Sequence, residues 1–353
     1  MNTLNLPPPL KVRPDMAPMW RDTDIDFDHA AELVIDTHDG DGDRRDLPIL
    51  DLRTWGVIPA DGQLALAPLG GHHQPRPMRS NAFTNLMARL SAPAEFIRDR
   101  LPAPLQLATV NYLLNEPDKS LSATLRLRDD EVTAIVSDRY APLDAEELMD
   151  AVRHALVQHH AVQDVRVKSV ATGLVDLLRL TFPAEQQAIK VGDVTAIGLD
   201  ISSSSFGRSA VHVRGLLWRI ACTNGLRMAE HQGGFSFRHV GESQRLRDGI
   251  AEAIPTCLAQ ARGLMDRWKL AVTTMVEDVA KQIENLRELT QGERKHVEEE
   301  LLKEASLPAL PESTSAYNLV NAITGAARHA EPSRRLDIES LAGSVLTRHV
   351  GRA

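Results

Sequence analysis

The chain has 353 residues, of which 43% are hydrophobic and only 4% aromatic, and its formal net charge is −8. That length and hydrophobic content suffice for about two domains with cores of Leu, Ile, Val, Ala and Met. No run of about 18 apolar residues occurs, which argues against a membrane-spanning helix. The opening stretch MNTLNLPPPLKVRPD lacks the apolar region of a secretory signal, so secretion is not expected.

The N-terminal region is strongly acidic. Residues 1–62 carry 13 acidic and 6 basic side chains, and the stretch Asp36–Asp46 is dense in Asp and Gly. We predict that residues 1–45 form an acidic, weakly ordered segment. Three alternate aspartates from Asp39 onward have the spacing that begins a calcium loop, but Leu50 stands where a bidentate Glu is needed. No metal site is therefore predicted.

Residues 46–240 alternate short helices with pairs of strands, and the gaps between successive strands are too short for parallel crossovers. We predict an α+β core domain with a mostly antiparallel sheet packed by helices. The expected strands are 47–69 as a hairpin around Asp61-Gly62, 121–128, 131–137, 165–170, 174–182, 194–201 and 208–214. The expected helices are 80–90, 94–100, 104–115 and 144–160, the last with Asp144 as its N-cap.

The stretch Val194–Met228 has the clearest local pattern. A strand rich in Val, Ile and Thr is followed by the turn Ser202–Gly207 and by a second, alternating strand. The apolar spacing from Leu216 onward then predicts a helix that ends at Asn224-Gly225. Residues 203–270 carry 10 basic and 5 acidic side chains, so this is the block that would attract a phosphate-bearing partner.

Residues 241–353 are predicted to form a helical region. Apolar side chains from Ile250 to Leu286 recur every three or four residues, as on one long helix. Because that track is longer than one small domain usually covers, we expect part of it to contact a second subunit in a homo-oligomer. Thr290 and Glu293 form a capping box, and two further helices are expected over 315–330 and 337–348.

Three segments resemble a known family, the domain of unknown function found in phage/plasmid-like proteins. They are Val136–Tyr140 with the following Leu143-Asp144, then Ser204–Gly225 with Arg219, and Ala316–Thr324. The resemblance covers about residues 80–350 and leaves the acidic N-terminus outside. It implies a mobile-element protein in a bacterial cytoplasm, often encoded near replication or recombination genes. An antiparallel sheet packed by helices also looks like the core of single-strand annealing proteins, which form rings or filaments on DNA.

Basic residues at alternate positions of a strand lie about 6.5–7 Å apart, which suits a row of phosphates. Two arginines on the predicted helix and two phenylalanines that are able to stack on bases extend this basic face. The alternative is a solvated strand face with paired arginines. The predicted nucleic-acid-binding residues are Arg208, His212, Arg214, Arg219, Arg227, Phe235, Phe237 and Arg238.

Catalytic motifs are absent from the sequence. No G-x-S-x-G, Walker A or dinucleotide fingerprint occurs, so neither an enzyme nor a cofactor is expected. Cys222 and Cys257 form no CxxC motif and are interpreted as reduced, buried thiols. We expect a single-stranded DNA-binding or annealing protein that acts in replication or recombination. The alternative is a non-enzymatic interaction or counter-defence protein that binds a host protein through its acidic N-terminal segment.

Overall fold

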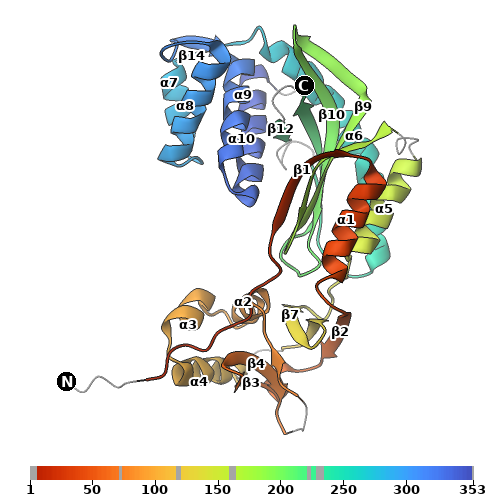
Figure 1. The fold of residues 1–353 in the computed structure, drawn as a ribbon, viewed down its shortest axis with the longest axis vertical. Coiled ribbons are helices and arrows are strands. Elements are labelled where there is room, and N and C mark those ends of the chain that lie inside the picture. The colour runs from red at the N-terminus through yellow and green to blue at the C-terminus, as the bar shows by residue number, and fades with distance from the viewer. Residues whose placement is uncertain are drawn as a thin grey trace, which may run out of the picture.

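The computed structural model describes residues 6–70, 74–116, 121–158, 164–220, 224–227 and 234–351. Figure 1 shows two lobes, each built around its own apolar core. The small lobe contains the core side chains from Ile49 to Ile135, and the large lobe contains those of residues 27–34 together with those from Ala141 onward.

The large lobe is built on one antiparallel sheet. Its strands run in the order β1-β8-β9-β10-β11-β12, with β13 also paired to β11, and each of these pairs is antiparallel. The predicted α+β class with a mostly antiparallel sheet is thereby confirmed. The strands are β1 (Met19–Ile25), β8 (Arg166–Thr172), β9 (Asp176–Lys190), β10 (Asp193–Ser203), β11 (Val211–Arg219), β12 (Asn224–Arg227) and β13 (Phe235–Phe237).

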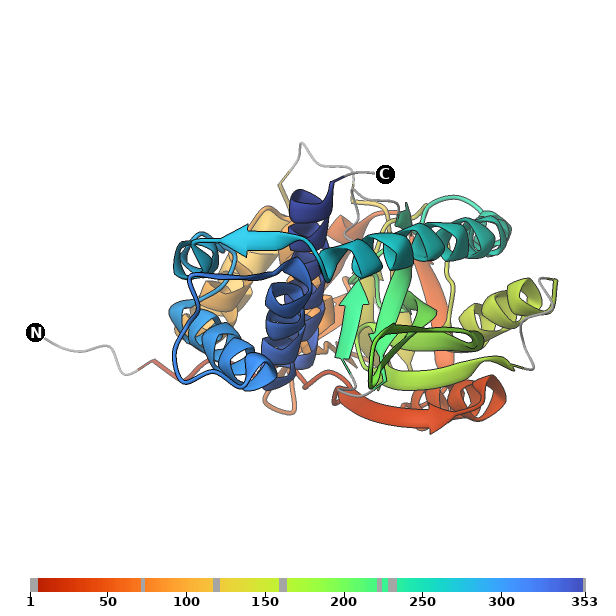
Figure 2. The same cartoon turned by 90° about the horizontal axis from the view of Figure 1, so that it is seen from above.

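The two faces of this sheet differ in polarity. Ile197, Leu199 and Ile201 of β10 point into the apolar core, where helices α1 (Phe27–Asp39), α5 (Ala145–Gln158) and α6 (Ser243–Ala271) pack. Figure 2 shows α6 lying along one side of the strands. Alternate residues such as Asp200 point to the opposite face, which α10 (Pro332–Val350) covers through buried charged side chains.

The small lobe combines two three-stranded sheets with three helices. The predicted hairpin around Asp61-Gly62 is confirmed, and both turn residues have positive φ (49° and 73°), as a tight two-residue turn requires. The sheets are β2 (Arg44–Ile49), β6 (Ala123–Arg128) and β7 (Glu131–Val136), and β3 (Trp55–Ala60), β4 (Gln63–Pro68) and β5 (Arg76–Pro77). The helices are α2 (Ser80–Arg89), α3 (Ala94–Arg100) and α4 (Ala103–Leu114), with a 3-10 turn η1 (Leu52–Thr54).

The C-terminal region is helical, but its first apolar track is not one helix. The predicted helix through Leu286 is wrong in its second half, because α6 ends at Ala271 and Asp278 adopts a left-handed backbone (φ 52°) before the next helix. The predicted capping box of Thr290 and Glu293 is confirmed. Among the described helices, none is both long and apolar enough to span a bilayer. The remaining elements are β14 (Met275–Glu277), α7 (Val279–Glu284), α8 (Gln291–Ala305), β15 (Ser313–Ser315), α9 (Ala316–Ala326) and η4 (Ala327–His329).

The helix predicted from Leu216 onward is also wrong. Leu216–Arg219 continue β11, and Asn224-Gly225 begin β12, which pairs with β11. β11 lies between β10 and β12 and is covered on both faces, so its inner positions are apolar without alternation. A buried strand of this kind gives the same short apolar run as a helix segment, and periodicity does not separate the two.

Residues 1–45 were expected to be weakly ordered, but the described part of this segment forms regular structure. β1 is the edge strand of the large sheet and pairs with β8, while α1 buries Phe27, Ala30 and Val34 in the large-lobe core. Leu10 and Val12 pack against the small-lobe core. The acidic composition suggested disorder, but the aspartates lie on the polar sides of β1 and α1, and the apolar sides of these elements are buried.

A buried charge network joins α10 to the polar face of the sheet. Arg179 (0% exposed) donates through Nε to Asp200 at 3.0 Å and also binds Glu339 of α10. Its guanidinium lies 5.6 Å from the ring centres of both Trp20 and Trp218. Asp200 also pairs with Arg227, so its carboxylate holds two buried arginines in place.

We predict that Asp200→Asn destabilises the protein by about 3–5 kcal/mol, because it leaves Arg179 and Arg227 as neighbouring buried cations without their shared anion. Urea unfolding measures the change. The matched control is Glu185→Gln, which removes the partner of the 55% exposed Arg262 and should cost less than about 1 kcal/mol. Equal losses in the two variants would contradict the proposed role of the network.

Candidate functional site: an arginine-lined cleft between the lobes

The small lobe contributes the last turn of α2 and the end of β7 to the junction between the lobes. Asn81, in the first turn of α2, donates through Nδ2 to the carbonyls of Thr133 and Phe206 at 3.1 Å each. These bonds tie α2 both to β7 and to the loop that follows β10. Asn85, one turn later, accepts the backbone N–H of Ile135 at 3.3 Å.

The large lobe contributes the serine turn predicted from the sequence. Ser204 Oγ accepts the backbone N–H groups of Phe206 (3.2 Å) and Arg208 (3.0 Å) and donates to the Leu174 carbonyl at 2.6 Å. A turn is thereby confirmed in this stretch, and the Ser204 hydroxyl satisfies two of its backbone amides. The turn also presents Gly207, with φ +67°, against Val136 of the small lobe.

The segment after β7 places Tyr140 between the two contributions. Its hydroxyl donates to the Ser204 carbonyl at 3.0 Å, and its ring stacks on His239 with 5.1 Å between ring centres. The Arg126 guanidinium lies 5.5 Å from the centre of the same ring. Burial raises the pKa of Tyr140 to about 12, and burial lowers the pKa of His239, so both rings are neutral at pH 7.

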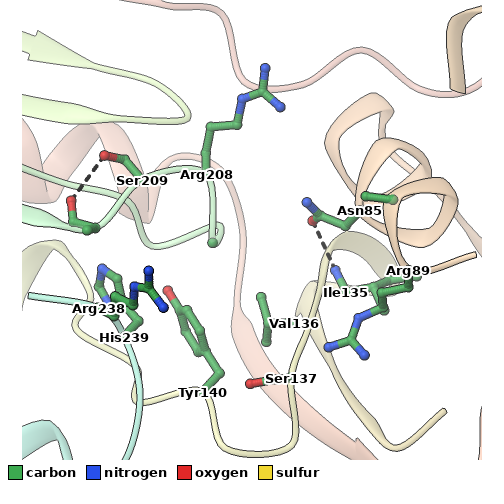
Figure 3. A pocket seen from close by; sticks show the side chains of 13 residues that line it. Asn85, Arg89, Ile135, Val136, Ser137, Tyr140, Arg208, Ser209, Arg238 and His239 are labelled. Atoms are coloured by element: carbon green, nitrogen blue, oxygen red, sulfur yellow. Dashed lines mark hydrogen bonds between the residues drawn. The ribbon is translucent and has the colours of Figure 1, made fainter. Parts of the chain in front are cut away.

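These segments enclose a cleft with a volume of about 460 Å³, which we call the arginine cleft (Figure 3). Figure 3 shows Arg238 beside the Tyr140 ring and Arg89 across the cleft, beyond Val136, while the Arg208 side chain extends from the rim and away from the ring. None of the lining residues is Asp or Glu. The lining residues are Asn85, Ala88, Arg89, Ile135, Val136, Ser137, Tyr140, Gly207, Arg208, Ser209, Ala210, Arg238 and His239.

The three arginines are only weakly neutralised. Arg208 and Arg238 are exposed, and neither side chain has an ion-pair partner within the described ranges. Arg89 donates to the Ser122 carbonyl at 3.2 Å. Burial lowers the pKa of Arg89, and the nearby Asp138 carboxylate only partly offsets this by raising it. The cleft therefore concentrates positive charge in a protein whose net charge is −8.

Of the eight predicted binding residues, Arg208 and Arg238 line this cleft together. His212 and Arg214 lie two apart on β11, with Arg214 Nη2 3.3 Å from His212 Nδ1, and both are partly buried. Their side chains point to the polar face of the sheet, as the alternation predicted, but neither lines the cleft.

We expected Arg219 and Arg227 to lie on a helix beside that strand, but both lie on strands. Because β11 continues to Arg219, its side chain points to the face opposite Arg214, where it binds Asp193 at 2.8 Å and Glu304 at 2.9 Å. Arg227 lies on β12, is only 3% exposed and forms an ion pair with Asp200. Buried ion pairs hold both guanidinium groups, which are therefore not presented to a ligand.

Phe235 and Phe237 stack on each other, with 6.2 Å between ring centres, and pack against the large-lobe core. Phe237 also packs on α6 at Gly249, where a Cβ would lie 2.8 Å from the ring. They are partly buried and do not line the cleft. No local sequence pattern points to Arg89 or Asn85, because they reach the site only through the packing of α2 beside β7.

A family model matches residues 132–349, more than half of the chain, and its description is "Domain of unknown function (DUF932)". The chain belongs to the DUF932 family. No curated protein and no solved structure matched it. The DUF932 match includes the cleft residues from Ile135 to His239 but not those of α2, so Arg89 comes from outside the matched domain.

We predict that Gly207→Ala destabilises the protein by about 2–3 kcal/mol, because a Cβ would lie 2.7 Å from Val136 Cγ1 and φ is +67°. Gly192→Ala is the matched control: φ is +79°, but no atom lies within 4 Å of its Cβ. The control should lose only about 1 kcal/mol in urea unfolding. Equal losses would show that the contact between the lobes at Val136 contributes nothing.

Of the two cysteines predicted to be buried, reduced thiols, Cys257 is buried and free, and Cys222 lies outside the described residues. Cys257 is 0% exposed, its Sγ donates to the Val213 carbonyl, and burial raises its pKa to about 12. In a Cys222→Ser variant at pH 8, we predict no reaction with a thiol-specific disulfide reagent until the protein is unfolded in urea, because the thiolate is the reactive form. Rapid labelling of the folded protein would contradict this.

Proposed function

We propose that this DUF932 protein binds single-stranded DNA through the arginine cleft. The observation that carries the proposal is that Arg89, Arg208 and Arg238, from three different elements, line one cleft whose lining includes no carboxylate. Binding of nucleic acid depends first on neutralising phosphates with Lys and Arg, and hydroxyl groups add hydrogen bonds to the phosphate oxygens. Ser137 and Ser209 supply such hydroxyls beside the arginines.

The charges of the surrounding protein favour this location over the strand face. Arg219 and Arg227 already have buried carboxylate partners, so binding a phosphate would require breaking an ion pair. Within the described ranges neither Arg208 nor Arg238 forms an ion pair, and the carboxylate that interacts electrostatically with Arg208, Asp15, makes no direct contact with it. We therefore assign the primary phosphate contacts to the cleft and leave Arg219, Arg227 and the two phenylalanines out of the proposed site.

The cellular role follows from the sequence resemblance. We propose a protein of a phage, plasmid or other mobile element, located in the bacterial cytoplasm, that protects or anneals single strands during replication or recombination. Homo-oligomerisation belongs to the same proposal. No enzymatic activity is proposed, because the titratable groups of the cleft, Tyr140 and His239, are engaged in contacts that fix the junction between the lobes.

The alternative role, binding of a host protein through acidic residues 1–45, has less support. Much of the negative charge of this segment is neutralised internally. Asp24 pairs with Arg166 and Lys168, Asp28 with Arg153, and Asp41 with Arg79. A basic partner would have to compete with these arginines.

We predict that Arg208→Ala/Arg238→Ala weakens binding to an oligothymidylate by about 100-fold, since each lost charge-assisted contact is worth about 1.5 kcal/mol. The slope of log K against log salt should also fall by about 1.4, from two lost contacts to a single strand. Fluorescence anisotropy across a salt series measures both quantities.

The matched control is Arg153→Ala/Arg262→Ala, which removes the same charge from two exposed ion pairs whose arginines do not line the cleft. It should leave affinity and salt slope nearly unchanged. If both double variants weaken binding equally, the effect is one of net charge and the cleft is not the site. If the wild-type protein binds no oligonucleotide even at low salt, the proposed function is overturned.

A further inference from the structure

The arginine cleft has an aliphatic wall as well as cations. Ala88, Ile135, Val136 and Ala210 line it. Ile135 and Val136 are only 2% and 7% exposed, so the packing of the small lobe fixes their position. In Figure 3 the Val136 side chain lies between Tyr140 and Ile135, within the ring of lining residues.

A phosphate group alone does not account for this lining. The volume of about 460 Å³ lies in the range of about 300–1,000 Å³ that is typical of sites for small organic ligands. Such sites combine apolar walls with a few placed polar groups. The occupant should therefore carry both an anionic group and a flat or apolar part of similar size to the wall.

One amide on the wall is held in a defined orientation. Asn85 Oδ1 accepts the Ile135 backbone N–H and the Asn81 Nδ2–H, each at 3.3 Å. The Nδ2 group of Asn85 remains as a hydrogen-bond donor beside Ala88 and Ile135. A carbonyl group on the apolar part of a ligand would find its partner there.

We infer that the arginine cleft takes one unpaired nucleotide of the bound strand, with its base on the aliphatic wall and its phosphates at Arg208 and Arg238. The inference rests on the proposed function and specifies which part of the strand enters the cleft. A nucleotide supplies the anion, the flat ring and the ring carbonyl or nitrogen that the lining calls for.

This arrangement selects single strands without reading their sequence. A base in a duplex is stacked and paired, and bringing it into a pocket costs the energy of flipping it out. For an unpaired base this energetic cost is much smaller. Because the wall is apolar and carries one donor, it discriminates weakly among bases but strongly between strands with and without accessible bases.

The test compares three ligands of equal strand length: oligothymidylate, a base-free sugar-phosphate strand, and the oligothymidylate paired in a duplex. All carry phosphates that reach Arg208 and Arg238, but only the first offers a free base. We expect the base-free strand and the duplex to bind at least about 5-fold more weakly than oligothymidylate. Free thymidine monophosphate should bind more weakly still, since it makes none of the flanking phosphate contacts.

The protein-side test is Ala88→Leu, which fills the cleft from an exposed helix position and leaves all three arginines in place. The ratio of affinities for oligothymidylate and the base-free strand should fall towards one. Ala108→Leu, at an exposed position of α4 that does not line the cleft, is the matched control and should keep the wild-type ratio.

The outcomes separate the two proposals. Equal, arginine-dependent binding of oligothymidylate and the base-free strand would overturn the nucleotide pocket but leave DNA binding intact. An unchanged ratio in Ala88→Leu would also overturn the pocket. Thymidine monophosphate binding as tightly as the oligonucleotide would overturn the assignment to a strand and identify a free nucleotide as the occupant. Absence of any arginine-dependent binding would remove the proposed function itself.

Discussion

At the centre of the junction between the lobes lies a buried ion pair, that of Arg126 with Asp144. Arg126 lies on β6 of the small lobe, Asp144 precedes α5 of the large lobe, and each is 3% exposed. Arg126 Nη2 donates to both carboxylate oxygens, at 2.9 and 2.8 Å. Burial would lower the pKa of Arg126, but Asp144 and Asp46 raise it, so the guanidinium stays charged. Separating the lobes would leave Asp144 without its partners Arg126 and Arg44, and Arg126 with Asp46 alone, at a cost of several kcal/mol.

That ion pair also explains why Tyr140 and the cleft behind it are well defined. Arg126 is anchored on Asp144, so its guanidinium is fixed over the Tyr140 ring, and His239 stacks on the same ring. The basic side chains of the large lobe then fall into two groups. Arg179 and Arg227 stabilise the fold through buried carboxylates, whereas Arg208 and Arg238 remain available at the cleft. Of the described arginines and lysines in the basic block of the sequence, therefore, only Arg208 and Arg238 line the cleft.

The sequence predicted local structure well where one periodicity dominates. The α+β class, the hairpin at Asp61-Gly62, the serine turn and the capping box at Thr290 all follow from local chemistry. It failed where tertiary burial changes the pattern: β11 is apolar on both faces and imitates a helix, and β1 is an edge strand that alternates weakly. The error at β11 misplaced two arginines: Arg219 points to the face opposite Arg214, and Arg227 lies on the paired strand β12, where it is buried against Asp200.

The candidate site was only partly predictable for a related reason. Arg208 and Arg238 stand out as basic residues of one block, but Arg89 comes from a helix of the other lobe and joins them only through tertiary packing. The cleft therefore exists only while the lobes keep their present arrangement. A ligand that contacts Arg89 and Arg238 together binds this arrangement and not an opened one, so binding must stabilise the junction by mass action. Affinity at the cleft and the strength of the Arg126–Asp144 pair are in this way thermodynamically coupled.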